Sequence, residues 1–183
     1  MHILGISGSL RVASKNTALL RTAIELAPKE LEFRIAPIST LPLFNEALTD
    51  DASLLPVTEF REAVSNADGV LIVTPEYNYG IPGPLKNAID WASRPSYRSP
   101  FYHKPVGIIG ASISVAGTAR AQGQLKQVLL GMAAQVFPNP EFLLGTAAQK
   151  FDESNVLTDA TTKEILAKFL GSFASWVDQV KPK

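Results

Sequence analysis

The side chains best suited to bind an anion lie in one segment near the N-terminus, between residues 8 and 17. Gly8 opens the segment, and hydroxyl, guanidinium and amide donors follow it: Ser9, Arg11, Ser14, Asn16 and Thr17. The pattern of residues 15–27 predicts a helix directly after this loop, with Ser14 as its N-cap. A helix N-terminus presents unpaired N–H groups and the positive end of a dipole, which together favour a phosphate. The segment is therefore either a phosphate-binding loop or an ordinary capped turn.

Two nucleotide-binding motifs are absent from this first loop. A P-loop requires Gly, four residues and then Gly-Lys-Ser/Thr, and the sequence contains no such string. The dinucleotide fingerprint Gly-x-Gly-x-x-Gly also fails, since Gly5 and Gly8 lack the third glycine. A bound phosphate would therefore belong to a mononucleotide rather than to ATP or a Rossmann-bound dinucleotide.

A second unusual loop, residues 75–88, combines aromatic side chains, an amide and several backbone breaks. Its first part consists of Pro75, Glu76, Tyr77, Asn78, Tyr79 and Gly80. Gly80 and Gly83 allow another group to approach the backbone closely, and Pro82 suits the start of a helix. A flat heteroaromatic ring lying here would meet N–H donors and tyrosine faces. The alternative is a rigid strand-to-helix turn whose tyrosines pack in the core.

The hydrophobic pattern of the chain predicts the elements that must position these loops. Short apolar runs predict strands at 3–7, 33–38, 69–74, 106–111 and 136–144, the last broken by two prolines. Helical spacing covers 15–27, 57–67, 82–92, 119–134 and 158–180. Residues 39–56 and 93–104 are polar and are predicted to be surface loops. With no repeat or linker, residues 1–183 form one domain of the α/β class: a doubly wound, five-stranded parallel sheet with helices on both faces. Ligands bind such sheets beyond the carboxyl ends of the strands, where the strand order reverses.

Composition excludes several function classes. Lys+Arg and Asp+Glu both number 17, so nothing in the net charge favours nucleic acid or an anionic membrane as a partner. The absence of cysteine excludes thiolate chemistry and cysteine-ligated metals, and we expect no metal site. His2 and His103 are expected to be structural or surface residues, and no side chain is nominated as a catalytic acid or base. No apolar stretch reaches the roughly 18 residues of a membrane span, and no signal peptide is apparent, so we expect a cytoplasmic protein without membrane insertion.

Taken together, the two loops resemble those of the NADPH-dependent FMN reductase family, which includes bacterial chromate and quinone reductases and related azoreductases. The resemblance rests on Gly8-Ser-Leu-Arg11 with Ser14 and Asn16-Thr17, and on the long run from Thr74 through Asn87 to Trp91. It implies a flavodoxin-like sheet with strand order 2-1-3-4-5. It also implies that Ser9, Arg11, Ser14, Asn16 and Thr17 bind the FMN phosphate, and that Pro75, Glu76, Tyr77, Asn78, Tyr79 and Gly80 cradle the isoalloxazine. Asn87, Asp90 and Trp91 are interpreted as structural.

The resemblance extends to a third loop, which follows the fourth strand. Ser112, Gly117 and Arg120 fit the family pattern, and Ser112 is expected beside the flavin ring. Ile113, Val115 and Thr118 stand where relatives are richer in glycine, which leaves the path of this loop open. Arg120 is equally compatible with a salt bridge on a helix.

The activity implied by the resemblance is an enzymatic two-electron transfer from NADPH or NADH, through bound FMN, to a small acceptor such as a quinone, azo compound, chromate or flavin. One alternative is a flavodoxin-like electron shuttle reduced by a partner protein, and another is an interaction domain without flavin. Relatives pair as homodimers or homotetramers. The aromatic segment 97–102 and the helix at 119–134 are candidate contacts for such an assembly.

Overall fold

The computed structural model describes residues 1–49, 54–138 and 140–181; part of the predicted 39–56 loop thus lies outside the described residues. The strands are β1 (His2–Ser7), β2 (Glu32–Ile35), β3 (Gly69–Val73), β4 (Pro105–Ala111), β5 (Gln135–Val136) and β6 (Phe142–Leu144). The helices are α1 (Lys15–Leu26), α2 (Leu55–Asn66), α3 (Gly83–Trp91), α4 (Ala119–Leu130) and α5 (Ala160–Val180). Two short 3₁₀ turns lie at Glu46–Leu48 and Ala147–Gln149.

The strands form one parallel sheet in the order β2-β1-β3-β4-β5, which confirms the predicted order. β1 lies between β2 and β3, so that Ile3 is opposite both Phe33 and Gly69. The chain moves outward in one direction from β1 to β2 and in the other from β1 to β3. The carboxyl ends of β1 and β3 therefore border the point where the strand order reverses, which is where ligands bind in such folds.

The fifth strand, predicted at 136–144 with a break at its two prolines, consists of two short strands, β5 and β6. β5 pairs with Pro105 and Val106 at the start of β4, whereas β6 pairs with residues Ile109 to Ala111 at its end. Pro138 and Pro140 lie between the two pieces. Because proline lacks a backbone N–H, it cannot donate to a strand ladder, and the edge of the sheet is interrupted there.

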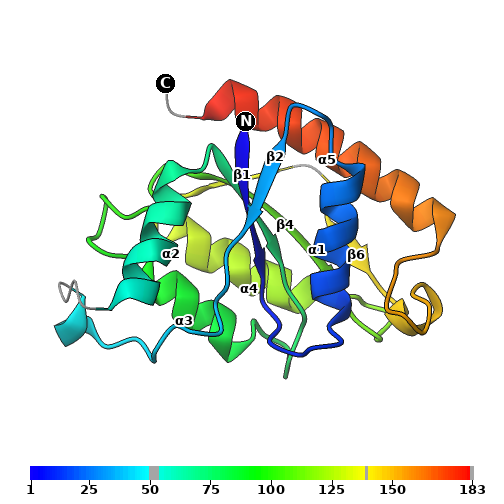
Figure 1. Cartoon of the computed structure of the whole chain (residues 1–183), viewed down its shortest axis with the longest axis horizontal. Helices are drawn as coiled ribbons and strands as arrows, with labels where there is room; N and C mark the ends of the chain where they lie inside the picture. Colours follow the sequence, from blue (N-terminus) through cyan, green and yellow to red (C-terminus); the bar gives the residue numbers. More distant parts are fainter. Residues whose placement is uncertain (50–53, 139, 182–183) are drawn as a thin grey trace.

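Helices cover both faces of the sheet, as Figure 1 shows. Leu19 and Leu20 of α1 pack with Leu166, Leu170 and Phe173 of α5 in one core. A second core contains side chains from the other three helices: Phe60 and Val64 from α2, Leu85 and Ile89 from α3, and Leu125 and Leu129 from α4. All residues of β3 and β4 are buried, as strands covered on both sides must be.

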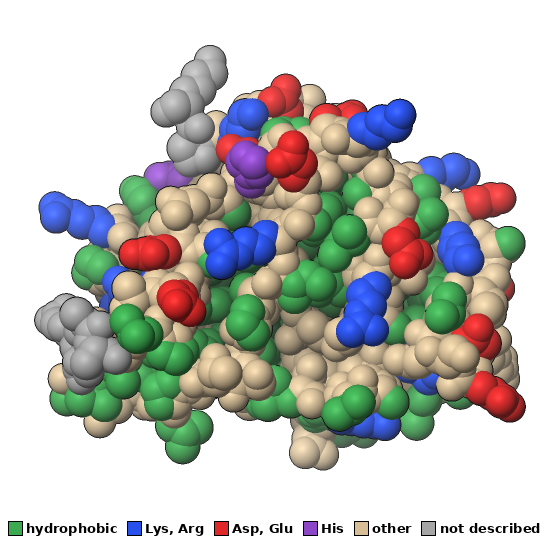
Figure 2. All heavy atoms as spheres, viewed as in Figure 1, with side chains coloured by type: hydrophobic (Ala, Val, Ile, Leu, Met, Phe, Trp, Pro, Cys, Tyr) green, Lys and Arg blue, Asp and Glu red, His purple; other side chains and the backbone are tan. Residues whose placement is uncertain are grey.

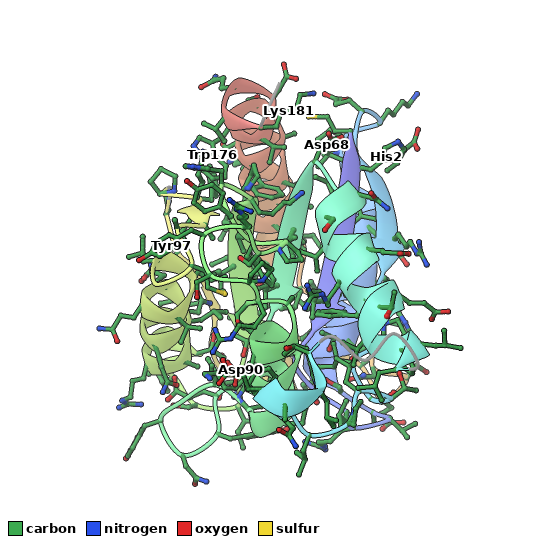
Figure 3. The ribbon with its side chains drawn as sticks, turned by 90° about the vertical axis from the view of Figure 1, so that its left-hand side faces the viewer. His2, Asp68, Asp90, Tyr97, Trp176 and Lys181 are labelled. Carbon is green, nitrogen blue, oxygen red and sulfur yellow. The ribbon has the colours of Figure 1, made fainter. Side chains whose placement is uncertain are left out.

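His2 lies at the amino ends of the strands, at the opposite edge of the sheet from the loops that follow β1, β3 and β4. At the amino edge the backbone N–H of His2 donates to the Asp68 carboxylate at 2.7 Å, and His2 Nδ1 lies 3.3 Å from Glu32. Figure 3 shows His2 and Asp68 together at this edge, with Asp90 at the opposite end of the molecule. His2 is therefore remote from the loops that follow β1, β3 and β4, in agreement with a structural role.

Side chains of α3 hold residues 42–44, which lie in the loop between β2 and α2. Asn87 accepts a hydrogen bond from the N–H of Phe44 at 2.7 Å and donates to the carbonyl of Pro42 at 2.9 Å. The indole N–H of Trp91 donates to the same carbonyl at 2.7 Å. Lys86 and Asp90 form an ion pair one turn apart on the helix. These contacts assign Asn87, Asp90 and Trp91 to the scaffold.

The surface has no strong charge bias on the face drawn in Figure 2, where acidic and basic side chains are interspersed. This distribution agrees with the equal numbers of acidic and basic residues. No helix in residues 1–49, 54–138 and 140–181 combines the length and the apolar character needed to cross a bilayer.

Candidate functional site

The loops after β1, β3 and β4 enclose a cleft of about 490 Å³ at the carboxyl edge of the sheet. Its wall is formed by Ser9, Arg11, Ala13, Ser14, Lys15, Asn16, Pro75, Glu76, Tyr77, Ala111, Ser112, Ile113 and Ala147. Among the hollows elsewhere on the described residues, one lies beside β2 and α2 and includes His2 and Glu32, and an apolar one lies between β6 and α5. Neither is lined by residues of the three loops, and the carboxyl edge is where the fold places a ligand.

The first loop ends in a capped helix, as predicted. The Ser14 hydroxyl accepts a hydrogen bond from the N–H of Thr17 at 3.2 Å, and the Thr17 hydroxyl lies 2.8 Å from that of Ser7. The backbone N–H groups of Lys15 and Asn16 have no acceptor among the described residues, because the first turn of a helix lacks intrahelical partners. The first turn of α1 contains no acidic residue. This end of the cleft is therefore rich in donors and suited to an anion.

Asn16 joins the first loop to the centre of the sheet. Its amide donates to the carbonyl of Ala111 at 2.9 Å and accepts from the N–H of Ala111 at 2.9 Å. The side chain is buried. Because Ala111 ends β4 and Ser112 follows it, this pair of bonds fixes the spacing between the first and third loops.

The second loop contains a tight reverse turn at residues 77–80. The N–H of Tyr77 donates to the carbonyl of Gly80, and the N–H of Gly80 donates to the carbonyl of Tyr77, each at 3.0 Å. Asn78 and Tyr79 between them have φ values of 50° and 66°. Positive φ at both central residues defines a type I′ turn, which is costly for a tyrosine and persists only where the surroundings hold it.

Glu76 supplies the main support for this turn. Its carboxylate accepts hydrogen bonds from the N–H groups of Arg120 and Ala121 at 3.0 and 3.1 Å, and from the Arg120 side chain at 3.0 Å. Glu76 thereby caps α4, whose own N-cap residue makes no side-chain cap. Burial alone would raise the pKa of the Glu76 carboxyl, but the bonds from Ala121 and Arg120, with the charge of Arg120, hold that pKa below its ordinary value.

Two further contacts fasten the second loop to α4. The Arg120 guanidinium lies over the Tyr79 ring, with its central carbon 4.3 Å from the ring centre. The side-chain oxygen of Gln124 accepts from the N–H of Ile81 at 2.7 Å. A Cβ atom at Gly80 would lie 2.7 Å from this same oxygen, so the absence of a side chain at Gly80 permits the contact. The second loop is thus built against the start of α4.

The third loop is held by the segment after β6. The N–H of Ser112 donates to the carbonyl of Leu144 at 2.9 Å, and the N–H of Ala147 donates to the carbonyl of Ser112 at 3.0 Å. The Ser112 hydroxyl accepts from the N–H of Ser114 at 3.2 Å. Gly117 has a φ of 61°, which glycine adopts without strain. Ser112 and Ile113 reach the cleft wall, whereas Arg120 serves the second loop.

Most of the residues predicted from sequence meet in this cleft. Its wall includes Ser9, Arg11, Ser14, Asn16, Pro75, Glu76, Tyr77 and Ser112, whereas Thr17, Asn78, Tyr79 and Gly80 do not line it. Sequence reasoning missed Ala13, Lys15, Ala111, Ile113 and Ala147 as wall residues. Lys15 had a recognisable signature, since it is a cation at the first position of a predicted helix. The described residues hold no cluster of three or more His, Asp or Glu side chains suited to a metal.

The donor set of the cleft fits a phosphorylated planar ring. Unpaired N–H groups and hydroxyls gather at the start of α1, and Pro75, Tyr77 and Ser112 form the wall beside them. A phosphate satisfies the first group, and a flat ring with polar edges satisfies the second.

Comparison with known proteins agrees with this geometry. The model of the family described as NADPH-dependent FMN reductase matches residues 1–149. An NAD(P)H-dependent FMN reductase of Pseudomonas aeruginosa is 42% identical over 181 residues, covering 99% of this chain and 97% of the relative. A quinone reductase of Escherichia coli K12 is 38% identical over 184 residues, covering 99% of this chain and 97% of the relative.

A solved structure with the same fold is that of FerB from Paracoccus denitrificans, described as a flavoenzyme NAD(P)H:(acceptor) oxidoreductase. It superposes with a TM-score of 0.90 at 35% identity, and the match covers 99% of both chains. The cleft, the strand order and these matches over nearly the whole length agree, and the chain belongs to the NADPH-dependent FMN reductase family.

Proposed function

We propose that the chain is an NAD(P)H-dependent oxidoreductase that binds FMN in the carboxyl-edge cleft and reduces small acceptors of the quinone type. The observation that carries the proposal is the meeting, in one cleft, of a helix N-terminus without acidic residues and Tyr77, the first residue of the strained 77–80 turn. Family membership and a sheet edge that suits a mononucleotide support it.

The residues divide into two groups by what they would hold. Ser9, Arg11, Ser14 and the N–H groups at the start of α1 would bind the phosphate. Pro75, Glu76, Tyr77, Asn78, Tyr79, Gly80 and Ser112 would form or support the wall against the ring, with Asn16 and Thr17 fixing the geometry behind them. When bound, FMN would supply the hydride and electron chemistry, so the chain's own task is binding, orientation and access.

The border of the cleft indicates the chemical character of the acceptor. Tyr77 and Ile113 are exposed at the wall of the cleft, with 45% and 76% of their surfaces accessible. Exposed apolar groups at a concave site favour a planar, largely apolar molecule over a strongly hydrated one. A quinone fits this border better than chromate.

Spectroscopy of the reconstituted protein tests the proposal directly. The purified chain loaded with FMN should be yellow, and anaerobic addition of NADPH or NADH should bleach it within seconds. Colour should return on addition of a benzoquinone. Retention of FMN without bleaching by either nucleotide would refute the reductase and favour the electron-shuttle alternative, and failure to retain FMN would favour the flavin-free one.

We further propose that the chain acts as a homodimer or homotetramer in the cytoplasm, where reduced nicotinamide nucleotides are supplied. Tyr97 in the loop before β4, marked in Figure 3, is 75% exposed, and Leu130 at the end of α4 is 64% exposed. Such apolar side chains favour contact with a second copy. Light scattering at micromolar concentration should give a multiple of the 19.7 kDa chain mass, and a monomer would contradict the assembly.

A further inference from the structure

Lys15 occupies a position that ordinary helix electrostatics disfavours. It is the first residue of α1, where the positive end of the helix dipole repels a cation. No acidic residue stands in the first turn, and no salt bridge in residues 1–49, 54–138 and 140–181 involves Lys15. Local rules are most often broken at functional sites, where a ligand supplies the missing compensation.

The Lys15 side chain is nevertheless held in place. Its ammonium lies 4.9 Å from the centre of the Phe151 ring, an arrangement that attracts a cation to the ring face. Phe151 is only 7% exposed and pairs with Leu157 in an isolated antiparallel bridge. The ring therefore belongs to a fixed part of the structure and can orient the lysine.

A second contact docks the Phe151 segment on the start of α1. The Asn155 amide donates to the carbonyl of the N-cap residue Ser14 at 3.1 Å. The nearby Asp152 carboxylate accepts from the N–H of Val156 at 2.8 Å and so closes its own turn. Segment 151–157 thus brings an aromatic face to Lys15 rather than a counter-ion.

The charges of the cleft are arranged asymmetrically. Arg11 and Lys15 are the cations in its wall, both in the first loop or directly after it, and Glu76 is the only carboxylate in that wall. The Glu76 oxygens are occupied by Arg120 and the N-terminus of α4. Positive charge is therefore uncompensated at the end of the cleft where the unpaired N–H groups of α1 lie.

We infer that Lys15, held by the face of Phe151, contacts the phosphate of the bound flavin and makes the site selective for FMN over riboflavin. This inference deepens the proposed function and rests on it. A compact ammonium contributes as a point charge and adds to the directional N–H groups of the helix. The dephosphorylated flavin offers it no partner.

Equilibrium titration with both flavins tests the inference, and it requires no catalytic turnover. Lys15→Met should weaken FMN binding at least about tenfold, equivalent to about 1.4 kcal/mol, and leave the riboflavin dissociation constant within about twofold. It should also reduce the salt dependence of FMN binding. Lys29→Met provides the matched control, because Lys29 is exposed just beyond the opposite end of α1 and should bind both flavins like the unaltered chain.

The role of Phe151 is tested by a double-mutant cycle. Phe151→Leu should weaken FMN binding severalfold in the unaltered background and have no further effect when Lys15 is already Met. An equal effect in both backgrounds would refute the part assigned to the ring.

The outcomes separate this inference from the proposed function. FMN binding by the unaltered chain, with the same affinity in Lys15→Met, would overturn the lysine contact alone. Equal weakening of FMN and riboflavin by Lys15→Met would also overturn it, because the loss would not depend on the phosphate. Failure of the unaltered chain to bind either flavin would overturn both proposals.

Discussion

At the scale of single residues, Glu76 shows how one carboxylate joins loops far apart in the sequence. Its lowered pKa means that folding favours the ionised form, so its contribution to stability is present above the unfolded pKa and is lost as pH falls through the folded pKa. Glu76→Gln should therefore lower the free energy of unfolding at pH 7 by about 1 to 2 kcal/mol. Urea unfolding over a pH series would measure this.

The same pH series shows whether the stability loss in Glu76→Gln depends on the charge of the carboxylate. The difference between the unaltered chain and Glu76→Gln should shrink as the pH drops below the usual range of a glutamate, because the carboxyl then becomes neutral in both states. Glu62→Gln, an exposed position on α2, should have no comparable effect. A difference that stays constant down to low pH would show that the charge of Glu76 is unimportant.

Gly110 on β4 leads to a second prediction at this scale. A Cβ atom there would overlap Thr118 Oγ1 and the carbonyl oxygen of Thr74, and the backbone of buried Thr74, directly after β3 and hydrogen-bonded to Ile109, has little room to move. Gly110→Ala should therefore destabilise the fold by about 3 kcal/mol. Gly5→Ala is the comparison and should cost less, because its Cβ would meet only the side chain of Leu20, with a terminal methyl nearest at 2.9 Å, and no backbone atom. Equal losses in urea unfolding would argue against the assigned overlap.

The same scale shows where sequence reasoning reaches its limit. The donors of the first loop could be predicted because a helix start and its N-cap are local features. The partners of Glu76 could not, because Arg120 and Ala121 are brought to it only when β3 and β4 pair. The type I′ turn also escaped prediction, since Asn78 is followed by Tyr79 rather than by the glycine that usually marks such a turn.

At the scale of elements, apolar spacing predicted each helix, and local residues decided where it ended. The helix expected over 119–134 ends at Leu130, with Gly131 at its C-cap. The strand expected over 136–144 is divided because its prolines cannot donate to the ladder. The prolines already marked a break in this strand in the sequence, whereas Gly131 was not recognised as the end of the helix.

Two helix glycines lead to a prediction about element stability. Gly123 in α4 and Gly171 in α5 each have open space where a Cβ atom would stand, with nothing within 4 Å. Glycine inside a helix costs about 0.5 to 1 kcal/mol relative to alanine, so Gly123→Ala and Gly171→Ala should each raise the free energy of unfolding by about that amount. Their effects should add, because the helices belong to separate cores. Denaturant unfolding of both single variants and the double variant would measure this, and a loss of stability would reveal an unseen contact.

At the scale of the whole molecule, alternating strands and helices predicted the doubly wound sheet, and the family resemblance supplied the strand order. The cleft exists only in the assembled sheet, because its three loops follow β1, β3 and β4. The helices after these loops pack in different cores: α1 in the first, α3 and α4 in the second. A ligand in the cleft therefore contacts loops that follow three different strands and adds to the contacts that already join them.

Thermal unfolding with and without FMN tests this dependence. A ligand that binds only the folded state at one hundred times its dissociation constant adds about 2.7 kcal/mol of stability. For a domain of this size each kcal/mol corresponds to about 2 to 4 °C, so FMN should raise the Tm by about 5 to 10 °C. Inorganic phosphate at the same concentration should raise it much less, because it meets the first loop but not the Tyr77–Gly80 turn. Equal shifts with phosphate and with FMN would mean that the second and third loops contribute nothing to binding.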